Sequence, residues 1–275
     1  MGSEAWTYTA AELTELYRSR QVSPVEVIDE VLSRIEQLDQ GYHAYLHVDR
    51  SGALAAAREA ELAWREPDGA PPLCGVPVSV KDTIEIDGMP TTYGSLAFDG
   101  RMAGDSEIGR RLRRSGACII GKTNTSEFAL STHTFNRLGP PTRNAWDRSR
   151  SAGGSSGGAA VAVAMGFGPI AVGTDSAGSV RLPAAYNGVF GLKPSWGAIP
   201  ARQEWRASPT RSHNGLITRT VADSIRAFEA LSDTATPNED GRGSVLKGKR
   251  VGVFEGDGDP RGLEPSVGRR DVRVE

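Results

Sequence analysis

The sequence predicts an α/β protein in which helices alternate with the short apolar strands of a largely parallel sheet. Helix-capping signals precede residues at helical spacing, short apolar runs mark buried strands, and two glycine-rich loops lead from strand signals into helix signals. The chain has 275 residues, of which 38% are hydrophobic and 24% charged, so it carries enough apolar material for a sizeable core.

The N-terminal part is predicted to be mainly helical. Thr9 and Ser23 each begin a capping box, in which a Glu three residues later completes the motif. A proline follows Ser23 at the first helical position, where its missing N–H costs nothing. A short strand is expected at 45–48, and an Ala-rich helix at 53–64.

Farther along the chain, strand and helix signals alternate, which is typical of parallel strands joined by crossover helices. The predicted strands lie at 76–80, 117–120, 170–173 and 250–254, and the predicted helices at 107–114, 157–165 and 221–231.

No linker is evident within this pattern. We therefore divide the chain into one domain at 1–254, with N-terminal helices at 9–66 and a catalytic core at 72–254, and an irregular tail at 255–275. A surface loop is expected at 237–243.

The composition argues against several classes of protein. The formal net charge is −2, which favours neither nucleic acid nor an anionic membrane as a partner. The N-terminus is polar and lacks the pattern of a signal peptide. Cys74 and Cys118 lie in apolar surroundings and are expected to be reduced and buried, as in a cytoplasmic protein. We expect no cofactor and no metal.

Two glycine-rich loops carry serines that could act as nucleophiles. The segment 153–158 reads Gly-Gly-Ser-Ser-Gly-Gly, and 173–179 reads Gly-Thr-Asp-Ser-Ala-Gly-Ser. Glycine lets the backbone approach a substrate closely, and a serine beside free N–H groups has the parts of a nucleophile with an oxyanion hole. The structural alternative is a tight turn in which Ser179 is the N-cap of a helix.

A serine nucleophile needs a base, and the best placed residue is Lys81. It ends an apolar strand, where partial desolvation would lower its pKa and let it act as a neutral base. The alternative is a solvated lysine paired with Asp82. None of the histidines belongs to a motif; they are His43, His47, His133 and His213, of which the last two lie in polar, loop-like sequence.

Taken together, these motifs resemble the amidase signature family, which includes the A subunit of glutamyl-tRNA(Gln) amidotransferase. The resemblance covers roughly residues 8 to 254. It rests on the segments 78–82, 121–124, 127–129, 153–158, 173–181 and 191–194. It implies an α/β/α layered domain with a mixed, largely parallel central sheet, shortened at the C-terminal end.

The resemblance also implies a Ser–cis-Ser–Lys triad. Ser179 would be the acyl-forming nucleophile, Ser155 would follow a cis peptide bond and relay the proton, and Lys81 would be the ultimate base. The second glycine-rich loop, at 173–179, would then be the nucleophile loop. The oxyanion hole would be formed by backbone N–H groups of this loop, namely those of Ser176, Ala177 and Gly178.

Supporting roles are implied for several further residues. Ser156 would orient Lys81 and the loop. Phe128 and Ala129 would line the substrate site. The shape of the nucleophile loop would depend on Thr174, Asp175 and Arg181.

Four functions remain open at this point. The first is an amide hydrolase acting on a small-molecule amide, and the second is the glutaminase-type subunit of a tRNA-dependent amidotransferase with partner subunits. The third is a truncated relative with little or no activity, and the fourth a phosphate-binding module at a helix N-terminus. Because regular patterning ends near residue 254, we expect a homodimer or a marginally stable monomer with a poorly ordered stretch at 255–275.

Overall fold

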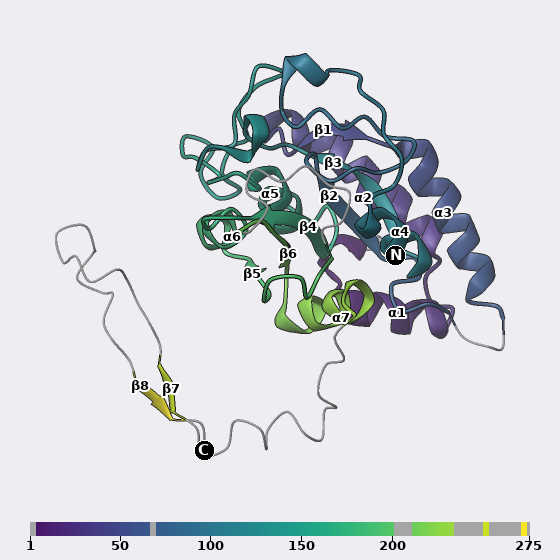
Figure 1. The fold of residues 1–275 in the computed structure, drawn as a ribbon. Helices are drawn as coiled ribbons and strands as arrows, with labels where there is room; N and C mark the ends of the chain where they lie inside the picture. The colour runs from purple at the N-terminus through teal and green to yellow at the C-terminus, as the bar shows by residue number, and fades with distance from the viewer. Residues whose placement is uncertain (1–3, 67–69, 201–210, 234–249, 253–270, 274–275) are drawn as a thin grey trace. The chain divides into compact units, whose positions relative to one another are not determined.

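The computed structural model describes residues 4–66, 70–200, 211–233, 250–252 and 271–273. The chain separates into two units, Met1–Thr234 and Ala235–Glu275. The first unit contains a six-stranded sheet in the order β1-β3-β2-β4-β6-β5 (Figure 1). Its strands are β1 (Tyr45–Val48), β2 (Pro77–Lys81), β3 (Cys118–Thr123), β4 (Ile170–Asp175), β5 (Phe190–Leu192) and β6 (His213–Thr218).

The sheet is mixed, as predicted. Strand β2 lies at its centre and pairs in parallel with both β3 and β4. Strand β1 is antiparallel to β3, and β6 is antiparallel to both β4 and β5. Parallel pairing is thus confined to the three strands at the centre, among the residues that the structure describes.

Strands β5 and β6 were not among the predicted elements. Strand β5 has only three residues, Phe-Gly-Leu, and β6 begins with the polar pair His213 and Asn214. Neither offers a run of apolar residues long enough to stand out in the sequence. The prediction of loop-like structure around His213 is therefore wrong, because the pairing of β6 with β4 makes this residue part of the sheet.

The helices of the first unit follow the predicted positions closely. They are α1 (Ala10–Arg18), α2 (Pro24–Leu38), α3 (Arg50–Ala63), α4 (Glu107–Arg114), α5 (Gly157–Ala164), α6 (Arg181–Asn187) and α7 (Val221–Leu231). Both predicted capping boxes are present, at Thr9 and at Ser23. Short 3-10 turns occur at Ala5–Thr7, Asp39–Gly41, Leu96–Phe98 and Glu127–Ala129.

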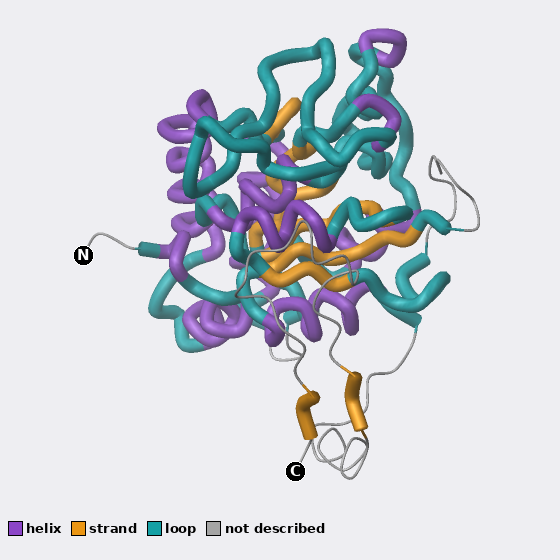
Figure 2. Tube along the Cα trace, turned by 90° about the vertical axis from the view of Figure 1, so that its left-hand side faces the viewer, coloured by secondary structure: helices purple, strands orange, loops and turns teal. Residues whose placement is uncertain are grey.

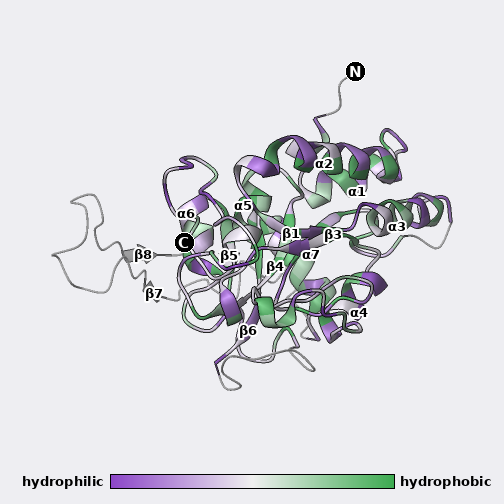
Figure 3. Cartoon of the chain, turned by 90° about the horizontal axis from the view of Figure 1, so that it is seen from above, coloured by the Kyte–Doolittle hydropathy of each residue, from purple (hydrophilic) through white to green (hydrophobic). Residues whose placement is uncertain are grey.

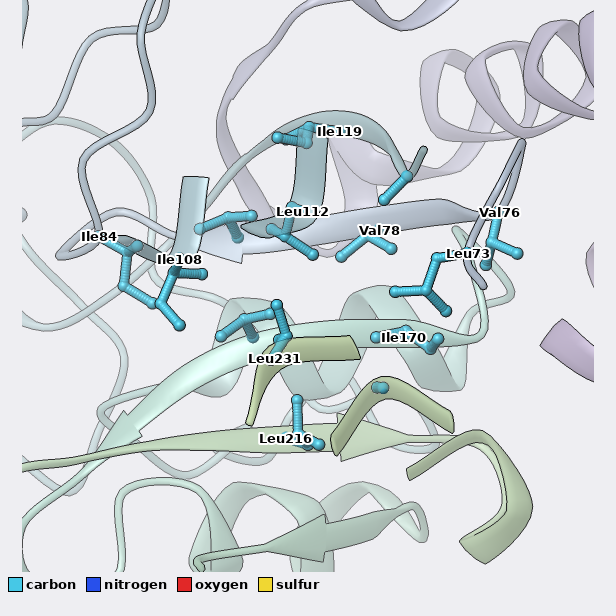
Figure 4. Close-up of a cluster of buried hydrophobic side chains, with 14 of the residues drawn as sticks. Leu73, Val76, Val78, Ile84, Ile108, Leu112, Ile119, Ile170, Leu216 and Leu231 are labelled. Atoms are coloured by element: carbon cyan, nitrogen blue, oxygen red, sulfur yellow. The ribbon is translucent and has the colours of Figure 1, made fainter. Parts of the chain in front are cut away.

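Two layers of helices enclose the sheet (Figure 2). On one face, Ile108 and Leu112 of α4 and Leu231 of α7 pack against sheet residues such as Val78 and Leu216 (Figure 4). The other face is covered by α2, α3, α5 and α6 through separate apolar clusters. Helices α2 and α3 are hydrophobic on one side and hydrophilic on the other, as their colours in Figure 3 show. The predicted α/β/α architecture is confirmed.

The second unit is described only in part. Strand β7 (Arg250–Gly252) pairs antiparallel with β8 (Asp271–Arg273). The strand predicted at 250–254 is therefore confirmed over its first three residues. The prediction that 255–275 is irregular is wrong at 271–273, because the charged sequence there pairs with β7. The rest of that stretch and the loop at 237–243 lie outside the described residues, and the domain boundary near 254 stays a prediction.

Both cysteines, Cys74 and Cys118, are free and buried, as predicted. Among the described helices, none combines the length and apolar character that a membrane span requires.

Candidate active site

The candidate site lies where β2 and β4 end. Lys81 is the last residue of β2, and Asp175 is the last residue of β4. The carboxyl ends of neighbouring parallel strands meet at one edge of a sheet, so the topology brings these two segments together. The two serine loops are also at this edge, since one leads into α5 and the other leads from β4 into α6.

Lys81 is completely buried, and its side-chain nitrogen contacts two hydroxyls. Its Nζ lies 2.7 Å from Ser155 Oγ and 2.9 Å from Thr174 Oγ1. The alternative of a solvated lysine paired with Asp82 is wrong. Successive residues of a strand point to opposite faces, and Asp82 instead bonds to Lys122 on the other face, with 3.2 Å between Oδ1 and Nζ.

Burial determines the protonation of Lys81. It lowers the pKa of this lysine from its ordinary value to about 7, although the negative charge of Asp175 acts in the opposite direction. A lysine with such a pKa is neutral in a large fraction of molecules at physiological pH. It can therefore accept a proton from a neighbouring hydroxyl.

Ser155 is also completely buried, and its Oγ faces the lysine. The peptide bond between Gly154 and Ser155 is cis, as the resemblance implied. The next residue, Ser156, lies near β4: its hydroxyl donates to the Thr174 carbonyl at 3.3 Å. Ser156 therefore contacts the backbone of Thr174, the residue whose hydroxyl bonds to Lys81, and its role in orienting Lys81 stays a prediction.

Ser179 is half-buried and follows β4 by four residues. Its carbonyl accepts a hydrogen bond from the Ser156 N–H at 3.2 Å, which ties the two serine loops together. The N-cap of α6 is Val180, so the alternative of Ser179 as a capping residue is wrong. Among the hydrogen bonds of the described residues, none joins Ser155 Oγ to Ser179 Oγ, and that part of the relay remains a proposal.

Asp175 organises the nucleophile loop. Its carboxylate accepts bonds from the Gly178 N–H at 2.7 Å, from the Val180 N–H at 3.1 Å, and from two nitrogens of Arg181 at 3.0 Å each. Burial alone would raise the pKa of Asp175, but the hydrogen bonds from Arg181 and the loop amides outweigh it and lower this pKa to about 2. The carboxylate is thus ionised at any working pH and holds the loop in a turn.

The predicted oxyanion donors differ in their hydrogen bonding and exposure. The N–H of Gly178 is held by Asp175, whereas Ala177 is exposed at the tip of the loop. The Ser176 hydroxyl is bonded to that of Ser212 at 2.8 Å. The roles of these donors in catalysis stay predictions.

The predicted role of two residues in lining the substrate site also stays a prediction. Phe128 and Ala129 form part of a 3-10 turn, and both have positive φ angles, of 51° and 59°. Phe128 packs edge-on against Phe98, with 5.9 Å between the ring centres.

Two residues contact the nucleophile loop in a way that was not predicted from the sequence, namely Ser212, which was not singled out, and His213, which was considered only as a possible base. Ser212 contacts Ser176, and His213 Nδ1 lies 3.2 Å from the carbonyl oxygen of Asp175. These contacts could not be predicted because strand β6, which brings both residues beside the loop, was itself not predicted. Among the described hydrogen bonds, no histidine side chain reaches Ser155 or Ser179.

A family model described as amidase matches residues 26–270. The chain belongs to the amidase signature family. It is 39% identical over 273 residues to the A subunit of glutamyl-tRNA(Gln) amidotransferase from Acidothermus cellulolyticus, covering 94% of this chain and 54% of that protein. It is 41% identical over 280 residues to the same protein from Salinispora arenicola, covering 94% and 56%. The chain thus spans little more than half the length of these curated relatives.

Solved structures of the amidase signature family share the fold. The crystal structure of an amidase aligns with a TM-score of 0.79 at 37% identity, over 84% of this chain and 53% of that one. A bacterial aryl acylamidase of the amidase signature family aligns with a TM-score of 0.78 at 34% identity, over 85% and 49%. The predicted family and fold are both confirmed.

Proposed function

We propose that this chain is an amide hydrolase that forms an acyl-enzyme on Ser179, with Ser155 relaying the proton to Lys81. The observation that carries the proposal is the contact of 2.7 Å between Ser155 Oγ and a buried lysine whose pKa is lowered to about 7. Such a lysine is a base of suitable strength near neutral pH.

The neutral amine of Lys81 has two N–H donors and one lone pair. Thr174 Oγ1 accepts from one donor, which leaves the lone pair free to accept the proton of Ser155. As Ser155 gives up its proton to Lys81, it takes one from Ser179. The Ser179 oxygen then forms a bond to the amide carbonyl carbon, and the carbonyl oxygen becomes an oxyanion.

The tetrahedral intermediate collapses when the C–N bond breaks. The proton on Lys81 returns through Ser155 to the departing amine, and the acyl group stays on Ser179 as an ester. Water, activated along the same path, attacks the ester and releases the carboxylic acid with a regenerated serine.

The oxyanion needs N–H donors in the nucleophile loop. We assign this role to Ser176 and Ala177, because the Gly178 N–H is held by Asp175 at 2.7 Å. Asp175 and Arg181 then serve to keep the donors in place.

Mass spectrometry after treatment with a fluorophosphonate tests the proposal. The intact protein should gain one phosphonyl group, and peptide mapping should place it on Ser179. Ser179→Ala should abolish the adduct, whereas Ser149→Ala, a matched change at an exposed loop serine, should leave it unchanged. An adduct on another residue, or none at all in a folded protein, would rule the proposal out.

A second candidate function is the glutaminase step of a tRNA-dependent amidotransferase. It is supported by the amidotransferase relatives, which are 39% and 41% identical to this chain. In that case the amide would be that of glutamine, and the ammonia would pass to partner subunits. Glutamine hydrolysis together with stable co-purification of such subunits would favour this candidate, and turnover of other amides by the isolated chain would favour the first.

A further inference from the structure

The segment 132–134 lies directly against the loop that carries Ser155. A Cβ atom added at Gly154 would lie 2.8 Å from the backbone N and C atoms of His133, and one added at Gly157 would overlap Thr134 Oγ1. Real Cβ contacts are essentially never that short. These two glycines are therefore explained by the close approach of this segment to the loop.

Thr134 makes the polar part of this contact. Its side chain is almost completely buried, with 2% of the residue exposed. Its hydroxyl donates to the Gly153 carbonyl at 2.8 Å and accepts from the Gly157 N–H at 2.9 Å. One hydroxyl thus holds the backbone on both sides of Ser155, and it also lies 3.4 Å from the Ser155 carbonyl oxygen.

The contact with Gly157 fills a gap at the start of α5. The first N–H groups of a helix have no partner within it, and usually the N-cap side chain accepts from one of them. The N-cap here is Ser156, whose side chain makes no cap and donates to the Thr174 carbonyl instead. Thr134 accepts from the first N–H of α5, that of Gly157, so this group has a partner outside the helix.

We propose that Thr134 is a positioning residue for Ser155: its hydroxyl fixes the backbone on both sides of the relay serine and thereby the distance from Ser155 Oγ to Lys81 Nζ. The inference rests on the proposed function, because a fixed distance matters only if a proton moves along it. Proton transfer depends steeply on such geometry, and a displacement of about 1 Å can cost about 10²-fold in rate.

The test compares two valine variants. Thr134→Val keeps the shape of the side chain and removes the hydroxyl. Thr142→Val is the matched control, because Thr142 is similarly buried and its hydroxyl also donates to a carbonyl, that of His43, and accepts from an N–H, that of the Asn124 side chain. Both variants lose a donated and an accepted buried hydrogen bond, but of the two hydroxyls only that of Thr134 bonds to the loop around Ser155.

The rate of labelling by a fluorophosphonate is expected to fall about 10- to 100-fold in Thr134→Val. It should be unchanged in Thr142→Val, and Thr134→Ser should restore most of it. In a Ser155→Ala background, Thr134→Val should add little further loss, because Thr134 acts through Ser155. The inference would be overturned if the loss of labelling rate in the double variant equalled the product of the two single losses. A wild-type labelling rate in folded Thr134→Val would also overturn it.

Hydrogen exchange separates this inference from the proposed function. Thr134→Val should speed exchange of the Gly157 amide relative to Thr142→Val, whether or not the wild-type protein is labelled. If the wild-type protein is not labelled but the Gly157 amide exchanges faster in Thr134→Val, only the proposed function is ruled out. If exchange of this amide is unchanged in Thr134→Val, the role of Thr134 is ruled out.

If Thr134→Val does not fold, Gly157→Ala gives the same test, since its methyl group would displace the Thr134 hydroxyl. Its labelling rate should fall although alanine favours a helix, and an unchanged rate would overturn the inference.

Discussion

Among the described residues, two lysines are completely buried in the sheet, and their surroundings differ. Lys81 ends β2, and Lys122 lies next to Val80 on the adjacent strand β3. Neighbours in register share a face and successive residues alternate, so Lys122 points to the face covered by α4 and α7, and Lys81 points to the face covered by α5. Burial lowers the pKa of both lysines.

The partners of the two lysines decide what each can do. Lys122 Nζ contacts the carboxylate of Asp82 at 3.2 Å, the Thr91 hydroxyl at 2.6 Å and the Pro90 carbonyl at 3.1 Å. A carboxylate in contact favours the charged form, which suits a structural ion pair. Lys81 contacts two hydroxyls, and the negative charge that acts on it, Asp175, is already bonded to Arg181. Burial alone thus does not make a base; the absence of a contacting carboxylate among the described residues distinguishes Lys81.

Replacing Lys81 should have the largest effect on chemistry. Lys81→Met is expected to slow fluorophosphonate labelling of Ser179 by about 10²–10⁴-fold, the usual loss when a proton acceptor is removed. Thermal unfolding should remain cooperative, because no buried carboxylate loses its partner. Wild-type labelling in Lys81→Met would show that the two lysines do not differ in the way proposed.

Replacing Lys122 should affect stability instead. Lys122→Met leaves the Asp82 carboxylate buried without its cation, which costs about 3–5 kcal/mol in the free energy of unfolding. Adding Asp82→Asn removes that charge and should recover part of the loss in denaturant titrations. The folded fraction of Lys122→Met should be labelled at the wild-type rate. A stable Lys122→Met protein would contradict the structural role.

The pH dependence of labelling should follow Lys81. Below its pKa of about 7 the lysine is protonated and cannot accept a proton, so the rate should fall about tenfold for each pH unit. Above that pH the rate should level off. The midpoint should persist in each single His→Gln variant, because no described histidine side chain bonds to either serine. A midpoint that disappears in one of these variants would identify a histidine as the base.

Much of the local structure was predictable from short-range signals. The capping boxes at Thr9 and Ser23 predicted where α1 and α2 begin, because a cap depends only on residues three positions apart. Strands β5 and β6 escaped prediction because their pairing with each other and with β4 gives them their structure. The strand at 271–273 escaped for the same reason, since its partner β7 is distant in sequence.

At the candidate site, too, some residues were predictable from sequence motifs and others were not. The motif residues Lys81, Ser155 and Ser179 were named from the sequence, and the structure brings Lys81 and Ser155 into contact. Thr134 and Ser212 carried no motif and were missed, because their importance lies in which parts of the two loops they touch. The predicted oxyanion donor Gly178 likewise could not be known to be held by Asp175.

The sequence by itself determined the family, the order of most elements and the residue types at the site. These depend on local requirements, such as glycine where the backbone is crowded and a cap where a helix begins. Only the tertiary structure decided that Lys81, and not Lys122, is a buried lysine without a contacting carboxylate, and that Thr134 holds the loop around Ser155. Burial and contact between residues 74 positions apart, as in Lys81 and Ser155, arise from packing of the whole sheet and its helices.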